Sequence, residues 1–339
     1  MFKEQRGKWH WILREAGILD SWFDNYQNLV KSHAVKSNPV RTVFHYDDYF
    51  IKLDRPEKIL HKLRSRWRSK AQIEFEIALT LEQASVPVVK HLGWGQCGDA
   101  SMLLTRAFPH SVTVMDYWLK SFVYGKADPT TFLEHFGRFL QTFFAANCYH
   151  PDFHTGNILY DPYSNKFALV DLYGIKADNR PLTQAELLKM YGIITCLRTV
   201  VSDTEAIAFI KKFKFKLDNK SPESLWQQLL EREISRIKAE WPKRKRQIIA
   251  EYDKFITRCD DKNGKYLFRN NQNRQPYIKA ELPLNTIAPK LYPLNLPSAE
   301  AERRWVAAFL NDFLGNEQNM PLVWYQPYDS PNSILYFLK

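Results

Sequence analysis

The residues of this chain that could do chemistry lie close together, between positions 150 and 174. The segment His150-Pro151-Asp152-Phe153-His154-Thr155-Gly156-Asn157 is followed, fourteen residues after the asparagine, by Asp171-Leu172-Tyr173-Gly174. Asp152 can accept a proton from an attacking hydroxyl group. Asn157 and Asp171 offer the oxygen ligands that Mg²⁺ prefers, at about 2.1 Å, with nucleotide phosphates and water completing the octahedron. Together these residues predict a phosphoryl-transfer site.

The sequence between the two oxygen ligands explains how they could meet. The apolar runs 158–160 and 167–170 flank the turn-forming segment Asp161-Pro162-Tyr163-Ser164-Asn165. Two such runs around a turn predict a β-hairpin. This hairpin would return Asp171 to the side of Asn157.

These residues resemble the protein-kinase-like superfamily, and more closely its lipopolysaccharide core kinases, which phosphorylate heptose or Kdo sugars. In that group the loop reads like His-Gly-Asp-Leu-His-x-x-Asn, so Pro151 and Phe153 depart from it without removing a reacting group. The resemblance covers residues from about 35 to about 215. It implies that Asp152 is the catalytic base and that Asn157 and Asp171 hold the metal.

His150 and His154 have two interpretations. They could be nitrogen ligands of a metal, but no cysteine or second histidine pair lies nearby at zinc spacing. We therefore expect both to support the loop, with His150 shaping the turn around Asp152 rather than transferring protons.

A kinase site also needs a lysine for the α- and β-phosphates of ATP and a carboxylate that orients it. Residues 41–52 predict a β-hairpin that ends at Lys52, and a helix is predicted from Ser69 to about Ala84. Helical spacing places Glu74 on the apolar stripe of the helix, whereas Glu76 shares its face with polar residues. A buried glutamate needs a partner, so we expect Glu74 to pair with Lys52.

One expected element is poorly represented. Residues 37–52 contain no glycine where many kinases have a glycine-rich loop over the phosphates. Without glycine the backbone approaches phosphates less freely. Arg41, Thr42 or the turn at Asp47-Asp48 could then make the contacts, and a non-catalytic pseudokinase stays open as an alternative.

The rest of the chain predicts the scaffold. Five apolar residues at helical spacing predict a helix that ends near Asn147: Phe132, Phe136, Phe139, Leu140 and Phe143. A capping box at Thr183–Glu186 predicts a helix through Val200, and Ser221-Pro222 predicts the start of another. The predicted fold is α+β and bilobal, of protein-kinase-like type. Residues 1–105 form a small strand-rich N-lobe, 106–258 a larger helical C-lobe, and 259–339 a C-terminal extension of unknown role, with strands at 265–269 and 275–279 and a helix at 299–313.

The composition and charge of the chain indicate its cellular location and the kind of partner it contacts. The chain has 339 residues, four scattered cysteines, no apolar signal segment at its N-terminus and no run of 18 apolar residues. We therefore expect a cytoplasmic protein. The net charge of +11 is concentrated at 58–70 and 243–246, which favours an anionic lipid-linked saccharide and peripheral contact with the cytoplasmic face of the inner membrane. Solvated helix faces would look similar, and no nucleic acid is expected.

The hypothesis is therefore a kinase that uses ATP and Mg²⁺ to transfer the γ-phosphoryl group to a sugar hydroxyl of lipopolysaccharide core, Kdo or heptose. A small-molecule kinase of the aminoglycoside or choline type shares the same loop and remains an alternative. A protein kinase is disfavoured, because no Ala-Pro-Glu segment follows Asp171.

Overall fold

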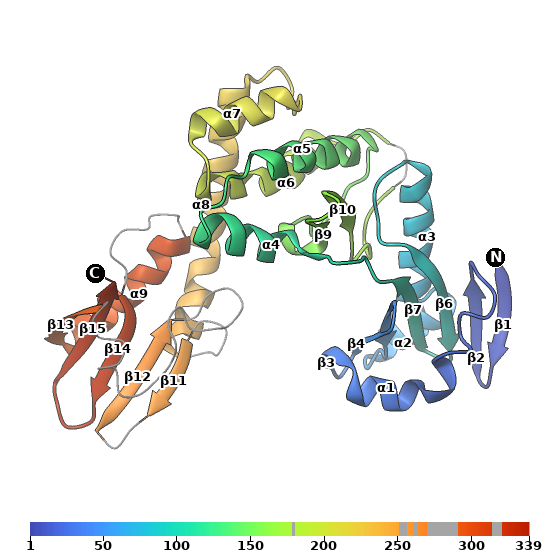
Figure 1. Ribbon diagram of the computed structural model, residues 1–339, viewed down its shortest axis with the longest axis horizontal. Coiled ribbons are helices and arrows are strands. Elements are labelled where there is room, and N and C mark those ends of the chain that lie inside the picture. Colours follow the sequence, from blue (N-terminus) through green and yellow to red (C-terminus); the bar gives the residue numbers. More distant parts are fainter. Residues whose placement is uncertain (178–179, 251–255, 261–262, 270–290, 314–320, 339) are drawn as a thin grey trace. The chain divides into compact units, whose positions relative to one another are not determined.

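The computed structural model describes residues 1–177, 180–250, 256–260, 263–269, 291–313 and 321–338. It contains two compact units, Met1–Trp226 and Gln227–Lys339. In Figure 1 the first unit includes the blue strands and the green helices. Both predicted halves of the phosphoryl-transfer site lie within this unit.

A seven-stranded antiparallel sheet forms the N-terminal part of the first unit, in the order β1-β2-β6-β7-β5-β4-β3. Its strands are β1 (Phe2–Arg6), β2 (Trp9–Leu13), β3 (Ala34–Asn38), β4 (Arg41–Tyr46), β5 (Tyr49–Asp54), β6 (His91–Cys97) and β7 (Ala100–Arg106). One face packs on the short helix α1 (Tyr26–Ser32) and on an aromatic cluster that includes Trp11, Trp22 and Phe44. The hairpin predicted at 41–52 is confirmed as β4–β5, although β5 continues two residues beyond Lys52.

Two helices follow β5 in the chain, α2 (Ile59–Trp67) and α3 (Lys70–Gln83). The predicted helix at 69–84 is confirmed as α3, and the Ser69 side chain caps it by accepting a hydrogen bond from the Gln72 backbone. The inner face of α3 buries Ala71, Phe75, Ala78 and Leu81. α3 therefore has a fixed position against β6 and β7.

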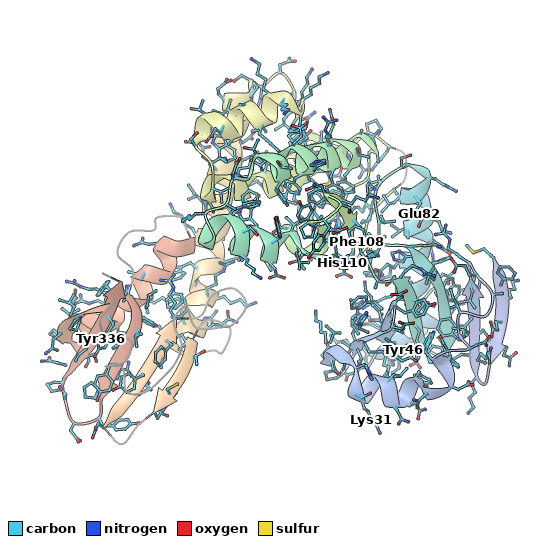
Figure 2. All side chains as sticks on the ribbon, viewed as in Figure 1. Lys31, Tyr46, Glu82, Phe108, His110 and Tyr336 are labelled. Atoms are coloured by element: carbon cyan, nitrogen blue, oxygen red, sulfur yellow. The ribbon has the colours of Figure 1, made fainter. Side chains whose placement is uncertain are left out.

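The remainder of the first unit is mainly helical. Figure 2 labels Phe108 and His110 on the segment that leads from β7 into this part. Its elements are β8 (Val112–Thr113), α4 (Val114–Tyr117), the π-helical turn Trp118–Tyr124, α5 (Thr130–Ala145), β9 (Ile158–Asp161), β10 (Lys166–Leu169), α6 (Gln184–Tyr191), the 3₁₀ segment Gly192–Thr199 and α7 (Asp203–Lys212). The five apolar residues predicted to line α5 are all buried. The hairpin predicted after Asn157 is confirmed as β9–β10, in which Leu169 pairs with Ile158.

One helix prediction in this part is wrong in its extent. The capping box of Thr183 and Glu186 is present, but α6 ends at Tyr191 and the chain continues as a 3₁₀ segment from Gly192. Glycine is a weak helix former, so the apolar spacing beyond it does not maintain α-helical geometry. The helix predicted at Ser221-Pro222 is confirmed as α8 (Pro222–Ile249).

The second unit combines the rest of α8 with strands and one further described helix. Its described strands are ordered β11-β12-β14-β15-β13. These elements are β11 (Ile256–Asp260), β12 (Gly264–Arg269), β13 (Leu291–Pro297), α9 (Ser298–Phe313), β14 (Pro321–Pro327) and β15 (Asn332–Leu338). The predicted strand at 265–269 and helix at 299–313 are confirmed as β12 and α9, whereas 275–279 lies outside the described residues.

Within the part of the chain that the structure describes, no helix has both the length and the apolar character needed to cross a membrane.

Candidate functional site

A buried ion pair joins the N-terminal sheet to α3. The Lys52 Nζ atom on β5 lies 2.7 Å from the Glu74 Oε1 atom on α3. Glu74 is only 2% exposed, whereas Glu76 is partly exposed and pairs with Arg68. The structure therefore confirms the prediction that Glu74 faces inward and contacts Lys52.

The surroundings of Glu74 keep its carboxylate charged. Burial acts to raise the pKa of Glu74, but the charge of Lys52 and the nearby His91 outweigh burial and hold the pKa well below its usual range. The His91 Nε2 atom lies 3.9 Å from the carboxylate, and the backbone N–H of Leu172 donates a hydrogen bond to it at 3.3 Å. Glu74 thus connects Lys52 to the residue that follows Asp171.

Asp171 lies directly beyond these contacts, after the end of β10. Its Oδ1 atom is 3.7 Å from Lys52 Nζ and 3.6 Å from the Arg41 Nη1 atom. The Asp171 backbone has φ +56°, in the left-handed region that few non-glycine residues adopt. Such conformations persist where the surrounding structure imposes them. Here the Leu172–Glu74 hydrogen bond on one side and the β9–β10 hairpin on the other fix the turn.

The loop that contains Asp152 packs against aromatic side chains of α5. The Phe153 ring stacks on Phe143 with centroids 4.7 Å apart. The His150 Nδ1 atom accepts a hydrogen bond from the Asp152 backbone at 3.2 Å, and the His150 backbone donates to the Met190 sulfur. Burial lowers the pKa of His150 to about 4, so the ring is neutral at pH 7. His150 therefore has the loop-shaping position that was predicted for it.

The Asp152 side chain is 79% exposed, so its carboxylate is accessible to an acceptor. The Nε2 atom of His154 lies 3.6 Å from the Asp152 Oδ2 atom. The other ring nitrogen of His154 accepts a hydrogen bond from the Gly156 backbone at 3.0 Å. His154 thus braces the turn between Asp152 and Asn157.

Asn157 links this loop to Asp171 through the backbone. Its Nδ2 atom donates to the Asp152 carbonyl at 3.0 Å, and its own carbonyl accepts from Val170 N–H at 3.0 Å. Because the amide nitrogen is engaged, the amide oxygen is the atom left to bind a cation. Among the described residues no group of three or more His, Cys, Asp or Glu side chains could enclose a metal. A Mg²⁺ ion bound by Asn157, Asp171 and nucleotide phosphates does not need one, since Mg²⁺ is usually held by one or two carboxylates plus phosphates.

The structure also separates the residues proposed to replace a glycine-rich loop. The β3–β4 turn is closed by the Asn38 side chain, whose Oδ1 atom accepts hydrogen bonds from the backbones of Val40 and Arg41. Arg41 then faces Asp171 and forms a 2.8 Å ion pair with Asp54. The Asp47-Asp48 turn instead lies at the opposite end of the β4–β5 hairpin, where the Asp48 carbonyl accepts from Ala107.

The sequence pattern named Arg41 only as one of several options and did not identify His91 or Asp54. Strand alternation places Arg41, Lys52 and Asp54 on one face, since Val43 pairs with Lys52 and Arg41 with Asp54. That signal could have been used only with the strand register known.

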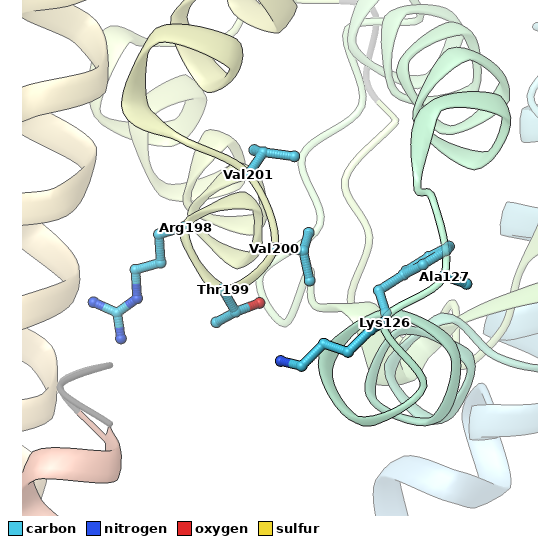
Figure 3. Close-up of a pocket in the computed structure, with 7 residues that line it drawn as sticks. Lys126, Ala127, Arg198, Thr199, Val200 and Val201 are labelled. Atoms are coloured by element: carbon cyan, nitrogen blue, oxygen red, sulfur yellow. The ribbon is translucent and has the colours of Figure 1, made fainter. Parts of the chain in front are cut away.

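A separate hollow of about 380 Å³ lies in the helical part, lined by Phe122, Lys126, Ala127, Arg198, Thr199, Val200 and Val201. Figure 3 shows the Lys126 side chain directed toward Thr199. None of the predicted site residues lines this hollow. It is therefore distinct from the arrangement around Asp171.

No protein-family model matches the sequence, and no curated protein matches it. Among solved structures the chain is similar to WaaP in complex with acyl carrier protein, with 13% identity and a TM-score of 0.45 over 61% of this chain and 89% of that one. It is also similar to WbdD with the kinase inhibitor LY294002, with 16% identity and a TM-score of 0.39 over 57% of this chain and 44% of that one.

Proposed function

We propose that this chain is a kinase that transfers the γ-phosphoryl group of ATP to a sugar hydroxyl of lipopolysaccharide core, Kdo or heptose. The observation that carries the proposal is the buried Lys52–Glu74 pair, whose lysine also faces Asp171. A lysine braced by a buried glutamate and directed toward a metal-binding aspartate is the arrangement that phosphoryl transfer requires.

Each residue has a defined role in this proposal. Lys52 and Arg41 would bind the phosphates, and Asn157 with Asp171 would hold Mg²⁺, which when bound neutralises charge on the nucleotide. Lys52 and Arg41 now share the Asp171 carboxylate at 3.7 and 3.6 Å. Asp152, on its exposed loop, would orient the acceptor hydroxyl and accept its proton.

A sugar acceptor is supported by the loop from His150 to Asn157, which resembles that of the lipopolysaccharide core kinases. The net charge of +11 favours an anionic acceptor such as a phosphorylated, lipid-linked saccharide. The wide exposure of Asp152 is compatible with a large acceptor, because nothing in the described loop encloses the carboxylate.

The test is transfer of labelled phosphate from γ-labelled ATP, with Mg²⁺, to purified core lipopolysaccharide, in parallel with aminoglycoside, choline and protein acceptors. Labelled saccharide is expected with the wild type and is expected to fall by roughly 10²- to 10⁴-fold in Asp152→Asn. Asp99→Asn changes a carboxylate in the turn between β6 and β7, outside the proposed site and 4.0 Å from Lys62, and serves as the control. Labelling of a different acceptor would show that the proposed substrate class is wrong. Wild-type turnover in Asp152→Asn would refute the assignment of Asp152 as the base.

A further inference from the structure

The short helix α2 presents an apolar surface that the rest of the fold does not cover. None of its nine residues is buried. Four large apolar side chains are instead strongly exposed: Ile59 at 76%, Leu60 at 78%, Leu63 at 51% and Trp67 at 91%. Isolated apolar residues on a surface are ordinary, but four on one two-turn helix form a patch that requires an explanation.

These four side chains share one side of the helix. At about 100° per residue, Ile59, Leu60, Leu63 and Trp67 fall within an arc of about 100°. Ser65 lies on the opposite side, where its hydroxyl donates to the Asp99 carbonyl and its own carbonyl accepts from Gln96. α2 is therefore attached to the β6–β7 hairpin by its polar side, and the apolar arc faces away from the sheet.

Positive charge borders the arc on both sides. Residues 58–70 contain six lysines and arginines and no acidic residue. Arg66 lies about 20° beyond one edge of the arc and Arg64 about 40° beyond the other. Arg66 also lines a hollow of about 600 Å³ beside the helix, together with Lys3, Trp94 and other residues of β1, β2 and β6. The apolar arc thus has basic side chains along both edges.

We propose that α2 docks this protein onto a membrane surface that contains anionic phospholipids. The apolar arc would enter the boundary between headgroups and acyl chains, and Arg64 and Arg66 would contact the phosphate groups. An exposed apolar face with a tryptophan, bordered by lysine and arginine, is the pattern of helices that lie in the membrane interface. The proposal concerns lipid binding alone, and it holds whether or not the chain transfers phosphate.

The first experiment measures sedimentation of the full-length protein with vesicles, without nucleotide. Vesicles of phosphatidylcholine alone are compared with vesicles of phosphatidylcholine and phosphatidylglycerol. The wild type is expected to bind the anionic vesicles and to bind neutral vesicles at least tenfold more weakly, because each basic residue near an anionic surface contributes a factor of roughly five. Equal binding to both vesicles, or to neither, would overturn the proposal, and an acidic partner protein would become the next occupant to test.

Variants then assign the binding to α2. Leu60→Gln, Leu63→Gln and Trp67→Gln together keep helix-forming residues and remove most of the apolar arc. This triple variant is expected to bind at least tenfold more weakly. Its control changes three exposed residues elsewhere, Val35→Gln, Tyr163→Gln and Tyr328→Gln, and should bind like the wild type. Wild-type binding by the α2 variant would show that the arc is not the docking surface.

Two double variants, each of which removes two positive charges, test the basic residues at the edges of the apolar arc. Arg64→Gln with Arg66→Gln removes two positive charges from α2, and Lys243→Gln with Lys245→Gln removes two from α8 in the second unit. The first pair is expected to weaken binding at least tenfold and the second by less than threefold. Equal losses would mean that net charge rather than α2 governs binding, and would contradict the proposal.

A lipid-depth measurement tests insertion directly. Brominated acyl chains quench tryptophan fluorescence only on close approach, and Trp67 is the tryptophan on α2. Quenching is expected in the wild type and should decrease in Trp67→Phe, which keeps an aromatic side chain and therefore most of the binding. Unchanged quenching in bound Trp67→Phe would place a different tryptophan in the membrane and refute the geometry.

Discussion

The two residues of the Lys52–Glu74 ion pair are unequally buried, so removing one or the other should cost different amounts of stability. The Glu74 side chain is 3% exposed and the Lys52 side chain 18%. Lys52→Met would remove the 2.7 Å partner of the Glu74 carboxylate and leave the Leu172 N–H, His91 and the more distant charge of Arg41. Breaking a buried pair in this way costs about 3 kcal/mol or more. Glu74→Gln should cost less, about 1–2 kcal/mol, since the amide oxygen can still accept from Leu172 and the lysine can reach water.

The double variant measures how much of the loss in Lys52→Met comes from the unpaired carboxylate. Lys52→Met with Glu74→Gln removes both charges, so it should be at least about 1 kcal/mol more stable than Lys52→Met alone. Urea unfolding of the full chain provides the free energies. Hydrogen exchange of the α3 amides identifies the transition that belongs to the first of the two compact units.

The contribution of Glu74 to stability should change in a different pH range, and in the opposite direction, in the variant. In the wild type the pKa of Glu74 is lowered from its ordinary value of 4.5, so its contribution to stability is complete above that value and is lost as the pH falls below it. In Lys52→Met burial should raise the pKa of Glu74, so the variant should gain stability as the pH falls from 8 to 5. A loss below about 1 kcal/mol together with an unchanged pH slope would refute this account of the pair.

Three further outcomes are expected. Asp152→Asn should leave the free energy of unfolding, measured in urea, within about 0.5 kcal/mol of wild type, since its side chain is 79% exposed, so that a large loss of stability would contradict a purely chemical role. Asp171→Asn should weaken Mg²⁺-ATP binding, measured by calorimetry, while the same variant binds metal-free ATP nearly as well as wild type; equal losses in both would argue against a metal ligand. His150 has a pKa lowered by burial to about 4, so its contribution to stability is complete above its ordinary value of 6.5 and is lost as the pH falls from there toward 4; His150→Gln should flatten that part of the stability profile, and an unchanged profile would contradict it.

The local parts of the fold were readable from the sequence because they depend on short-range rules. The hairpin after Asn157, the orientation of Glu74 and the aromatic face of α5 follow from turn residues and helical spacing, and the structure has all three. The sequence does not predict the 3₁₀ segment that begins at Gly192, because the apolar spacing continues through it. Periodicity records which residues face the core and is a poor guide to where the helical geometry changes.

Long-range features were less accessible. The N-terminal strands β1 and β2 join the edge of the sheet because β2 pairs with β6, eighty or more residues away. His91 reaches Glu74 only because β6 packs against α3. The basic residues of α2 were visible in the sequence, but the exposure of its apolar residues was not. A pattern of Ile59, Leu60, Leu63 and Trp67 would ordinarily indicate a helix packed on the core.

Arg41 shows how the site could bind phosphates without glycine. A glycine-rich loop brings backbone N–H groups to the phosphates, which needs a backbone free of side chains. Here the N–H groups of Val40 and Arg41 are taken by the Asn38 side chain, so the β3–β4 turn cannot offer them to a ligand without opening. The turn instead fixes Arg41, whose guanidinium group faces Asp171. A guanidinium group binds phosphate through two parallel hydrogen bonds, so one rigid arginine can replace several backbone donors. Arg41→Lys would keep the charge and lose that geometry. It should therefore reduce the free energy of ATP binding, measured by calorimetry, by more than it reduces the free energy of unfolding, measured in urea.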